Sequence, residues 1–386
     1  MKRIRRVLRP ATDRAPAFSL AYTRSGPPTD TPIVVIPGGP GLGSIQPYRS
    51  FRRWAAGGGL DVIMVEHRGV GFSRNDVSGR PLPHAAMWVR DVVDDIAAVL
   101  DEERVRSAFI VGSSYGTYVA SSFASRHPER VAGMILDSAL QSTGDLAFER
   151  ERVRALFWDA DDEVAGAVRR LVDSGRGGRH LLEVVRAAYE LGGPDIVRPL
   201  VASRLAGGPA PTWRALEVYA ARDESIARIP YYYEFGIAGA IGFRELHYAA
   251  RPDGLPLDPA LTYARLAHRF PAFVGEPFDL LRETRSFTWP VVILVGSRDL
   301  RTPPDAARRV AAGIRDATVV DIDNGHSALD THPAALLNAM RHLSRGTPHR
   351  LAALGAQLDR LPRPGQAGLL PRWLGRAVNL EAALRR

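Results

Sequence analysis

The stretch FIVGSSYGTYVASSFA, residues 109–124, joins a short apolar run to a helical pattern through a turn rich in glycine and serine. Gly112, Ser114 and Gly116 fit the pattern G-x-S-x-G at that junction. The flanking residues must be small because the turn is sharp, and its strain lifts the serine hydroxyl above the sheet. The following helix points its N-terminus at the same place, where it favours negative charge. We therefore expect Ser114 to be a catalytic nucleophile.

Runs of apolar, β-branched residues alternate with helical patterns on both sides of this stretch. Such near-continuous runs are typical of strands buried on both faces, as in parallel sheets covered by helices. The expected strands are residues 32–39, 60–69, 107–114, 130–139, 289–297 and 317–323. The alternation predicts an α/β fold with a mostly parallel, doubly wound sheet.

Residues 141–286 break this alternation, because strand-like runs are scarce there and helical, Arg- and Ala-rich segments dominate. The sheet pattern resumes afterwards, so we expect an inserted helical cap, or lid, over 141–286 and a core made of residues 1–140 and 287–345. An Arg-rich C-terminal extension follows over 346–386. We expect this extension to pack on the protein or to stay loosely ordered; docking to a partner or to an anionic surface is the alternative.

A serine nucleophile needs a neighbouring base, and the base needs an acid that orients it. Asp299 lies just past one predicted strand, and His326 lies in a loop past the next. With Ser114 they follow the chain order serine, acid, histidine. Asp137, which also follows a strand, and Asp323, close to His326, are alternative acids. We expect Asp299 to be the acid because of its strand-end context.

A second glycine-rich loop, IPGGPGLGS, occupies residues 36–44 directly after the first predicted strand. Exposed backbone N–H groups in such a loop can bind a phosphate or the oxyanion of acyl transfer. The loop lacks the Lys-Ser/Thr of a P-loop, and its glycines miss the dinucleotide-binding spacing. We therefore expect an oxyanion hole made by the backbone N–H groups of Gly39 and Tyr115.

Three motifs make the chain resemble the proline iminopeptidase family of α/β-hydrolases. That family carries His-Gly-Gly-Pro-Gly, Asp-x-Arg-Gly-x-Gly-x-Ser and Gly-x-Ser-Tyr-Gly. Here these motifs stand as Pro37-Gly38-Gly39-Pro40-Gly41, Glu66-His67-Arg68-Gly69-Val70-Gly71-Phe72-Ser73 and Gly112-Ser113-Ser114-Tyr115-Gly116. The resemblance covers about residues 15–140 and 287–345 and is faint over the cap. It implies an α/β-hydrolase fold and a serine hydrolase.

The departures from the family's motifs bear on the substrate. Pro37 replaces a histidine that could tie the oxyanion loop in place, and Glu66 replaces the usual aspartate. Relatives with similar motifs cleave amides, esters, lactones or epoxides, although an epoxide hydrolase of this fold would carry Asp in place of Ser114.

Aminopeptidases of the resembled family bind the free amine of their substrate with carboxylates of the cap. The aromatic, acidic stretch 223–248 is the best candidate here. The resemblance suggests Glu234 and Glu245 as amine ligands and Tyr231, Tyr232 and Tyr233 as pocket walls. The alternative is that these glutamates pair with nearby arginines, such as Arg244, and that the tyrosines belong to the core of the cap.

The composition narrows the possible classes of function and ligand. The net charge of +9 comes almost entirely from arginines spread along the chain, with Lys2 as the only lysine, so we expect no nucleic-acid binding. The chain has no cysteine, no metal-ligand spacing among its histidines and no transmembrane run, so we expect no metal, no cofactor and a cytoplasmic location. Association into a homo-oligomer is left open.

The sequence as a whole favours a serine hydrolase that releases an N-terminal proline or small apolar residue from a short peptide or amide. One alternative is an ester or lactone hydrolase, or an acyl-transfer enzyme, acting on a small molecule in a biosynthetic pathway. A noncatalytic member of the fold that serves binding is the third hypothesis.

Overall fold

A central sheet organises the chain in the computed structural model, which describes residues 4–207, 209–220 and 230–383. The sheet has eight strands in the order β1-β2-β4-β3-β5-β6-β7-β8. The strands are β1 (Arg5–Arg9), β2 (Phe18–Ser25), β3 (Ile33–Ile36), β4 (Val62–Val65), β5 (Ala108–Ser113), β6 (Val131–Asp137), β7 (Val291–Gly296) and β8 (Ala317–Ile322). From β4 to β8 all neighbouring strands are parallel, which confirms the predicted α/β class.

Strands β1 and β2 were not expected from the sequence. They pair antiparallel with each other and join the sheet through an antiparallel β2–β4 pair. Strand β1, RRVLR, is an exposed edge in which three arginines leave an apolar run of only two residues. Strand β2, FSLAYTRS, mixes polar and apolar residues in the same way. Neither has the continuous apolar run that marks the buried parallel strands.

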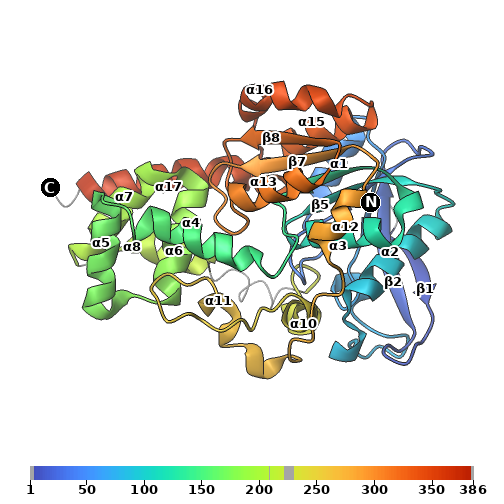
Figure 1. Cartoon of the computed structure of the whole chain (residues 1–386), viewed down its shortest axis with the longest axis horizontal. Coiled ribbons are helices and arrows are strands. Elements are labelled where there is room, and N and C mark those ends of the chain that lie inside the picture. The colour runs from blue at the N-terminus through green and yellow to red at the C-terminus, as the bar shows by residue number, and fades with distance from the viewer. Residues whose placement is uncertain (1–3, 208, 221–229, 384–386) are drawn as a thin grey trace.

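Helices connect the strands and cover both faces of the sheet (Figure 1). They are α1 (Arg49–Gly57), α2 (Val89–Glu102), α3 (Tyr115–Arg126), α4 (Asp145–Phe157), α5 (Glu163–Leu171), α6 (Arg179–Gly192), α7 (Pro194–Leu205), α8 (Pro211–Ala220), α10 (Phe235–Glu245), α11 (Leu261–Ala264), α12 (Leu280–Glu283), α13 (Pro304–Gly313), α14 (Ala328–Thr331), α15 (Pro333–Ser344), α16 (Gly355–Asp359) and α17 (Gln366–Ala383).

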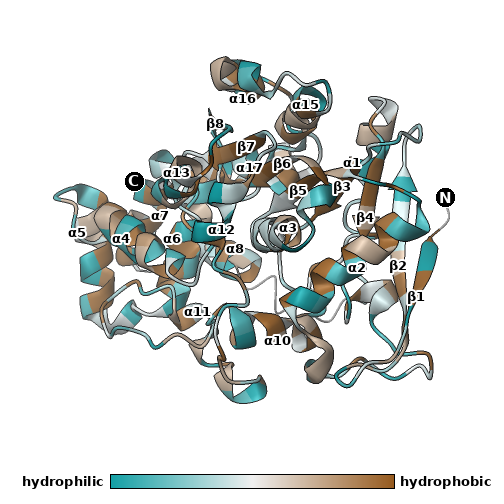
Figure 2. Cartoon of the chain, turned by 45° about the vertical axis from the view of Figure 1, so that its right-hand side comes forward, coloured by the Kyte–Doolittle hydropathy of each residue, from teal (hydrophilic) through white to brown (hydrophobic). Residues whose placement is uncertain are grey.

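Two apolar cores lie against the two faces of the sheet. One is built by α2, α3 and α13, with Val93, Phe123 and Val310 among its buried side chains. The other is built by α1 and α15, with Phe51 and Leu336. In Figure 2 the central strands are brown and the helices beside them carry both brown and teal, as expected for strands covered by helices on both faces.

The helices between β6 and β7 pack in two places. Helices α4 to α8 surround a separate apolar core and form a lobe beside the sheet (Figure 1). Helix α17 of the C-terminal extension lies across this lobe and contributes the buried side chains of Leu374 and Val378. Helix α10 instead packs on the sheet, because Ile237 and Ile241 belong to the core that contains α2 and α3.

Candidate active site

Ser114 stands on the sharp turn between β5 and α3. Its φ of 54° and ψ of −124° place a non-glycine residue in a strained conformation. The turn fits only because its neighbours are small: a Cβ on Gly112 would lie 2.2 Å from the carbonyl oxygen of Gly116. A Cβ on Gly116 would lie 2.1 Å from the carbonyl oxygen of Ile36. The two glycines therefore allow the strand and the helix to meet closely enough to present Ser114.

The structure brings Ser114 together with His326 and Asp299, each of which follows a different strand. The imidazole Nε2 of His326 lies 2.8 Å from the Ser114 hydroxyl oxygen. Its Nδ1 lies 3.0 Å from both carboxylate oxygens of Asp299. That carboxylate also accepts from the backbone N–H groups of Arg301 and Thr302 and from the Thr302 hydroxyl. A base is thus placed between a hydroxyl and an orienting acid.

The charges of this pair stabilise each other. Burial disfavours the ionised Asp299, but the charge and hydrogen bond of His326, with the donors Thr302 and Ser138, outweigh it and lower its pKa to about 2. Burial likewise disfavours the charged imidazole, but Asp299 raises the pKa of His326 above its ordinary value. An ionised Asp299 therefore faces an imidazole that readily takes up a proton.

Of the alternative acids, neither contacts the His326 ring. The carboxylate of Asp137 accepts from the Ser113 hydroxyl at 2.8 Å and from the backbone N–H groups of Ala328 and Leu329 at 2.8 and 3.0 Å. Burial raises the pKa of Asp137 to about 6, against the effect of those donors. Asp137 thus holds the segment that follows His326. Asp323 is exposed and pairs with Arg298.

The predicted oxyanion loop passes directly over the nucleophile. A Cβ on Gly38 would lie 3.3 Å from the Cβ of Ser114. Gly39 has a φ of +133° and a Cβ there would lie 2.7 Å from the backbone nitrogen of Gly41, so this position requires glycine. Within the described residues, the backbone N–H groups of Gly39 and Tyr115 donate to no acceptor. Both predicted oxyanion donors are thus available.

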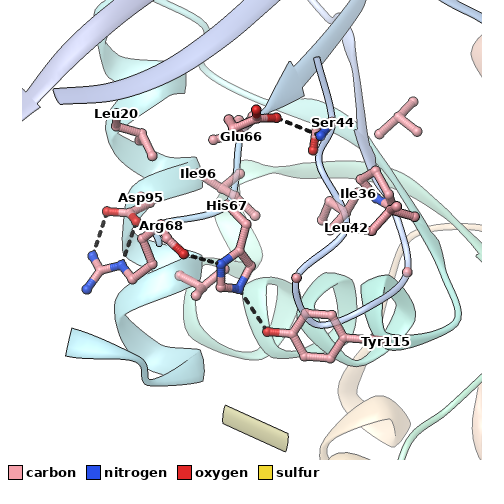
Figure 3. Close-up of a pocket in the computed structure, with 16 residues that line it drawn as sticks. Leu20, Ile36, Leu42, Ser44, Glu66, His67, Arg68, Asp95, Ile96 and Tyr115 are labelled. Carbon is pink, nitrogen blue, oxygen red and sulfur yellow. Dashed lines mark hydrogen bonds and ion pairs between the residues drawn. The ribbon is translucent and has the colours of Figure 1, made fainter. Parts of the chain in front are cut away.

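The far end of this loop is fixed from β4. The buried carboxylate of Glu66, just past that strand, accepts from the backbone N–H of Ser44 at 2.6 Å (Figure 3). It also accepts from the backbone N–H of Ile45 at 2.9 Å. The guanidinium of Arg52 donates to the carbonyl oxygens of the same two residues. Burial raises the pKa of Glu66 to about 7, although these N–H groups and Arg52 act in the opposite direction.

The predicted tyrosine walls contact the oxyanion loop through their backbone. The Gly43 N–H donates to the carbonyl oxygen of Tyr232, and the Glu234 N–H donates to that of Gly41, both at 2.7 Å. Tyr231 and Tyr232 are partly exposed, and the ring of Tyr231 stacks on that of Phe72. The ring of Tyr233 is buried and stacks on Phe235. The part of the predicted recognition stretch over 223–229 lies outside the described residues.

The two predicted amine ligands are already engaged within the fold. Glu234 pairs with Arg74 at 3.2 Å. Glu245 is buried and accepts from the backbone N–H of Val89, the first residue of α2, at 2.7 Å. The neighbouring Arg244 points elsewhere, onto the Trp88 ring and the carbonyl oxygen of His84. Burial raises the pKa of Glu245 to about 7, and no ion pair to it is present among the described side chains.

Two side chains beside the catalytic groups, those of His67 and Glu190, were not expected from the sequence. His67 contacts Tyr115, the residue after the nucleophile, as shown in Figure 3. Glu190 on α6 accepts from the Leu300 N–H at 3.3 Å and lies 3.5 Å from Arg301. Position 67 is in the quoted Glu-His-Arg-Gly motif and could have been identified there. Glu190 has no local signal, because it reaches the site only through the packing of α6.

In the ranges that the structure describes, no group of three histidine or acidic side chains could hold a metal ion. None of the described helices has both the length and the apolar character needed to cross a membrane.

In comparisons with known proteins, a family model described as the alpha/beta hydrolase fold matches residues 31–185 of this chain. A proline iminopeptidase of Neisseria meningitidis is 29% identical over 120 residues, 30% of this chain and 34% of that protein. The chain thus spans about a third of the length of such relatives. Rhodomycin D methylesterase DauP of a Streptomyces species is 28% identical over 307 residues, 78% of this chain and 87% of that protein.

Among solved structures, that of VinJ aligns over 88% of this chain and 98% of its own, with 15% identity and a TM-score of 0.53. At this identity the likeness concerns the fold alone.

Proposed function

We propose that this chain, which has the α/β-hydrolase fold, is a serine hydrolase that works through an acyl-enzyme. The observation that carries this proposal is the hydrogen-bonded line from the Ser114 hydroxyl through His326 to Asp299, with heavy-atom distances of 2.8 and 3.0 Å. Two N–H groups beside it that donate to no acceptor among the described residues, those of Gly39 and Tyr115, supply the oxyanion hole.

The reaction proceeds in two halves. The Ser114 oxygen attacks the acyl carbon while Nε2 of His326 takes up the hydroxyl proton, and Asp299 stabilises the imidazolium. The carbonyl oxygen becomes an oxyanion held by the N–H groups of Gly39 and Tyr115. The imidazolium returns its proton to the leaving group, which departs from the acyl-enzyme. A water molecule, deprotonated by His326, then releases the acid and restores the serine.

We propose a carboxylic ester as the bond that is cleaved. Two observations support an ester over the N-terminal residue of a peptide. Glu234 is paired with Arg74, and Glu245 binds the first N–H of α2, so both predicted amine ligands already have partners. The methylesterase similarity extends through the helices between β6 and β7, whereas the iminopeptidase similarity covers 30% of the chain.

An aminopeptidase is the second candidate, and one observation favours it. No described side chain forms a close ion pair with the buried carboxylate of Glu245, and the charges of Arg244 and Arg90 leave its pKa raised to about 7, so a substrate ammonium group could pair with it. In either case we propose that helices α4 to α8, covered by α17, form a lid that shapes the substrate site.

Turnover of a matched substrate panel tests the choice of bond. The panel holds methyl and p-nitrophenyl esters, and aminoacyl p-nitroanilides with either a free or an acetylated amine. We expect ester hydrolysis that disappears in Ser114→Ala, with no preference for a free amine. Preferential cleavage of free-amine anilides that is lost in Glu245→Gln, but not in the control Glu234→Gln, would contradict the ester proposal and support the aminopeptidase.

A further inference from the structure

Tyr115, the residue after the nucleophile, is hydrogen-bonded through its side chain to His67, which takes no part in the triad. The hydroxyl of Tyr115 lies 3.1 Å from Nε2 of His67 (Figure 3). The other ring nitrogen, Nδ1, lies 2.6 Å from the carbonyl oxygen of Arg68. A carbonyl can only accept, so Nδ1 carries the proton and Nε2 is the acceptor for the Tyr115 hydroxyl.

Both partners are held in the neutral forms that this hydrogen bond needs. Burial lowers the pKa of His67 to about 4, although the hydrogen bond to the Arg68 carbonyl and the charge of Asp95 act against it. Burial also raises the pKa of Tyr115 well above its ordinary value. At neutral pH the imidazole therefore accepts and the phenol donates.

The arrangement has a counterpart on the other side of the oxyanion hole. Glu66 and His67 are consecutive residues at the carboxyl end of β4. The first fixes the oxyanion loop through the backbone N–H groups of Ser44 and Ile45. The second fixes Tyr115, whose backbone N–H is the other proposed donor. The end of one strand thus sets the separation of the two donor segments.

This side support matters because the tyrosine has room to move. A cavity of about 30 Å³ lies between the oxyanion loop and the His67–Tyr115 pair, lined by Pro37, Gly38 and Leu42 among others. A cavity of that volume is large enough to hold a water molecule. Pro37 has neither a backbone N–H nor a polar side chain, so it offers the tyrosine no donor from the loop side.

We propose that His67 is a positioning residue of the oxyanion hole: through the Tyr115 hydroxyl it holds the Tyr115 backbone N–H toward the oxygen on which negative charge develops. This inference rests on the proposed serine hydrolase function. A displacement of less than 1 Å at that N–H weakens a hydrogen bond that is formed most strongly in the transition state. Loss of His67 should therefore slow the acylation of Ser114 without changing the titration of His326.

The test is the second-order rate constant for phosphonylation of Ser114 by an alkyl fluorophosphonate, measured across pH. We expect Tyr115→Phe and His67→Leu each to react about tenfold more slowly, a fraction of the loss on deleting an oxyanion donor. The double variant should be no slower than either single variant, because both remove the same contact. His67→Gln, whose amide oxygen can accept from the phenol, should recover most of the rate. The pH of half-maximal reactivity should not move in any of them.

Val65→Ala is the control, since Val65 lines the same cavity without bonding to Tyr115. It should lower the unfolding temperature and leave the rate constant unchanged. Wild-type rates in folded Tyr115→Phe and His67→Leu would overturn the inference, as would additive losses in the double variant or an equal loss in Val65→Ala. If the wild-type protein itself fails to react, the proposed function fails instead.

Discussion

The carboxylate of Glu190, on α6, accepts a hydrogen bond at 3.3 Å from the backbone N–H of Leu300, the residue next to Asp299. The same helix reaches the histidine loop, because a Cβ on Gly325 would lie 2.5 Å from the carbonyl oxygen of Glu190. Glu190 therefore contacts the loops of both the acid and the base.

This contact predicts an effect on the pH profile. Glu190 raises the pKa of His326, and Arg301 lowers it. Hydrolysis needs the neutral imidazole, so the acidic limb of kcat/KM follows that pKa. Glu190→Gln should move the limb to lower pH, and Arg301→Gln should move it to higher pH, each by about 0.5 unit. Shifts of the same sign in both variants would contradict the prediction.

Loss of the Asp299 carboxylate should mainly lower kcat, whereas loss of the Asp137 carboxylate should mainly lower the free energy of unfolding. Asp299→Asn keeps the shape but cannot stabilise the imidazolium, so kcat should fall by roughly 10³ to 10⁴. Asp137→Asn cannot satisfy all three of its donors, so it should lower the free energy of unfolding by about 2–3 kcal/mol and kcat by less than about tenfold. Esterase assays and urea unfolding check both. Full activity in Asp299→Asn would refute the assignment of the acid.

Gly112, two residues before the nucleophile, should tolerate no side chain. Gly112→Ala would place a methyl group 2.2 Å from the Gly116 carbonyl oxygen and 2.7 Å from the Thr117 Cα, both backbone atoms. We expect a loss of about 3 kcal/mol in the free energy of unfolding. The control is Gly57→Ala, since nothing lies within 4 Å of a Cβ there. It should change stability by less than about 1 kcal/mol, and equal unfolding temperatures for the two variants would argue against this geometry.

Helix α17 should stabilise the lobe that it covers. Leu374 is 1% exposed in the core of that lobe, whereas Leu369 on the same helix is 66% exposed. Leu374→Ala should lower the free energy of unfolding by about 2–4 kcal/mol, because it leaves a cavity. Leu369→Ala should change it by less than about 0.5 kcal/mol. Equal, small effects in urea unfolding would mean that α17 is not part of this core.

The sequence predicts the sheet well because its parallel strands are buried on both faces and read as unbroken apolar runs. It also places Ser114, His326 and Asp299 on the ends of those strands, where parallel topology brings them together. The antiparallel β1 and β2 escaped prediction because β1 is an exposed edge and β2, although mostly buried, mixes polar with apolar residues, so neither has such a run. Contacts such as those of Glu190 and Glu245 depend on how helices far apart in the chain pack, and no local pattern encodes that packing.

The most direct test of the account is the site of covalent labelling. Wild-type protein and the variants Ser114→Ala, His326→Ala and Asp137→Asn would be treated with a fluorophosphonate and examined by intact mass and peptide mapping. The account predicts one label per wild-type chain, on Ser114, absent from Ser114→Ala, strongly slowed in His326→Ala and retained in Asp137→Asn. An unlabelled but folded wild-type chain, or a label on any other residue, would contradict it.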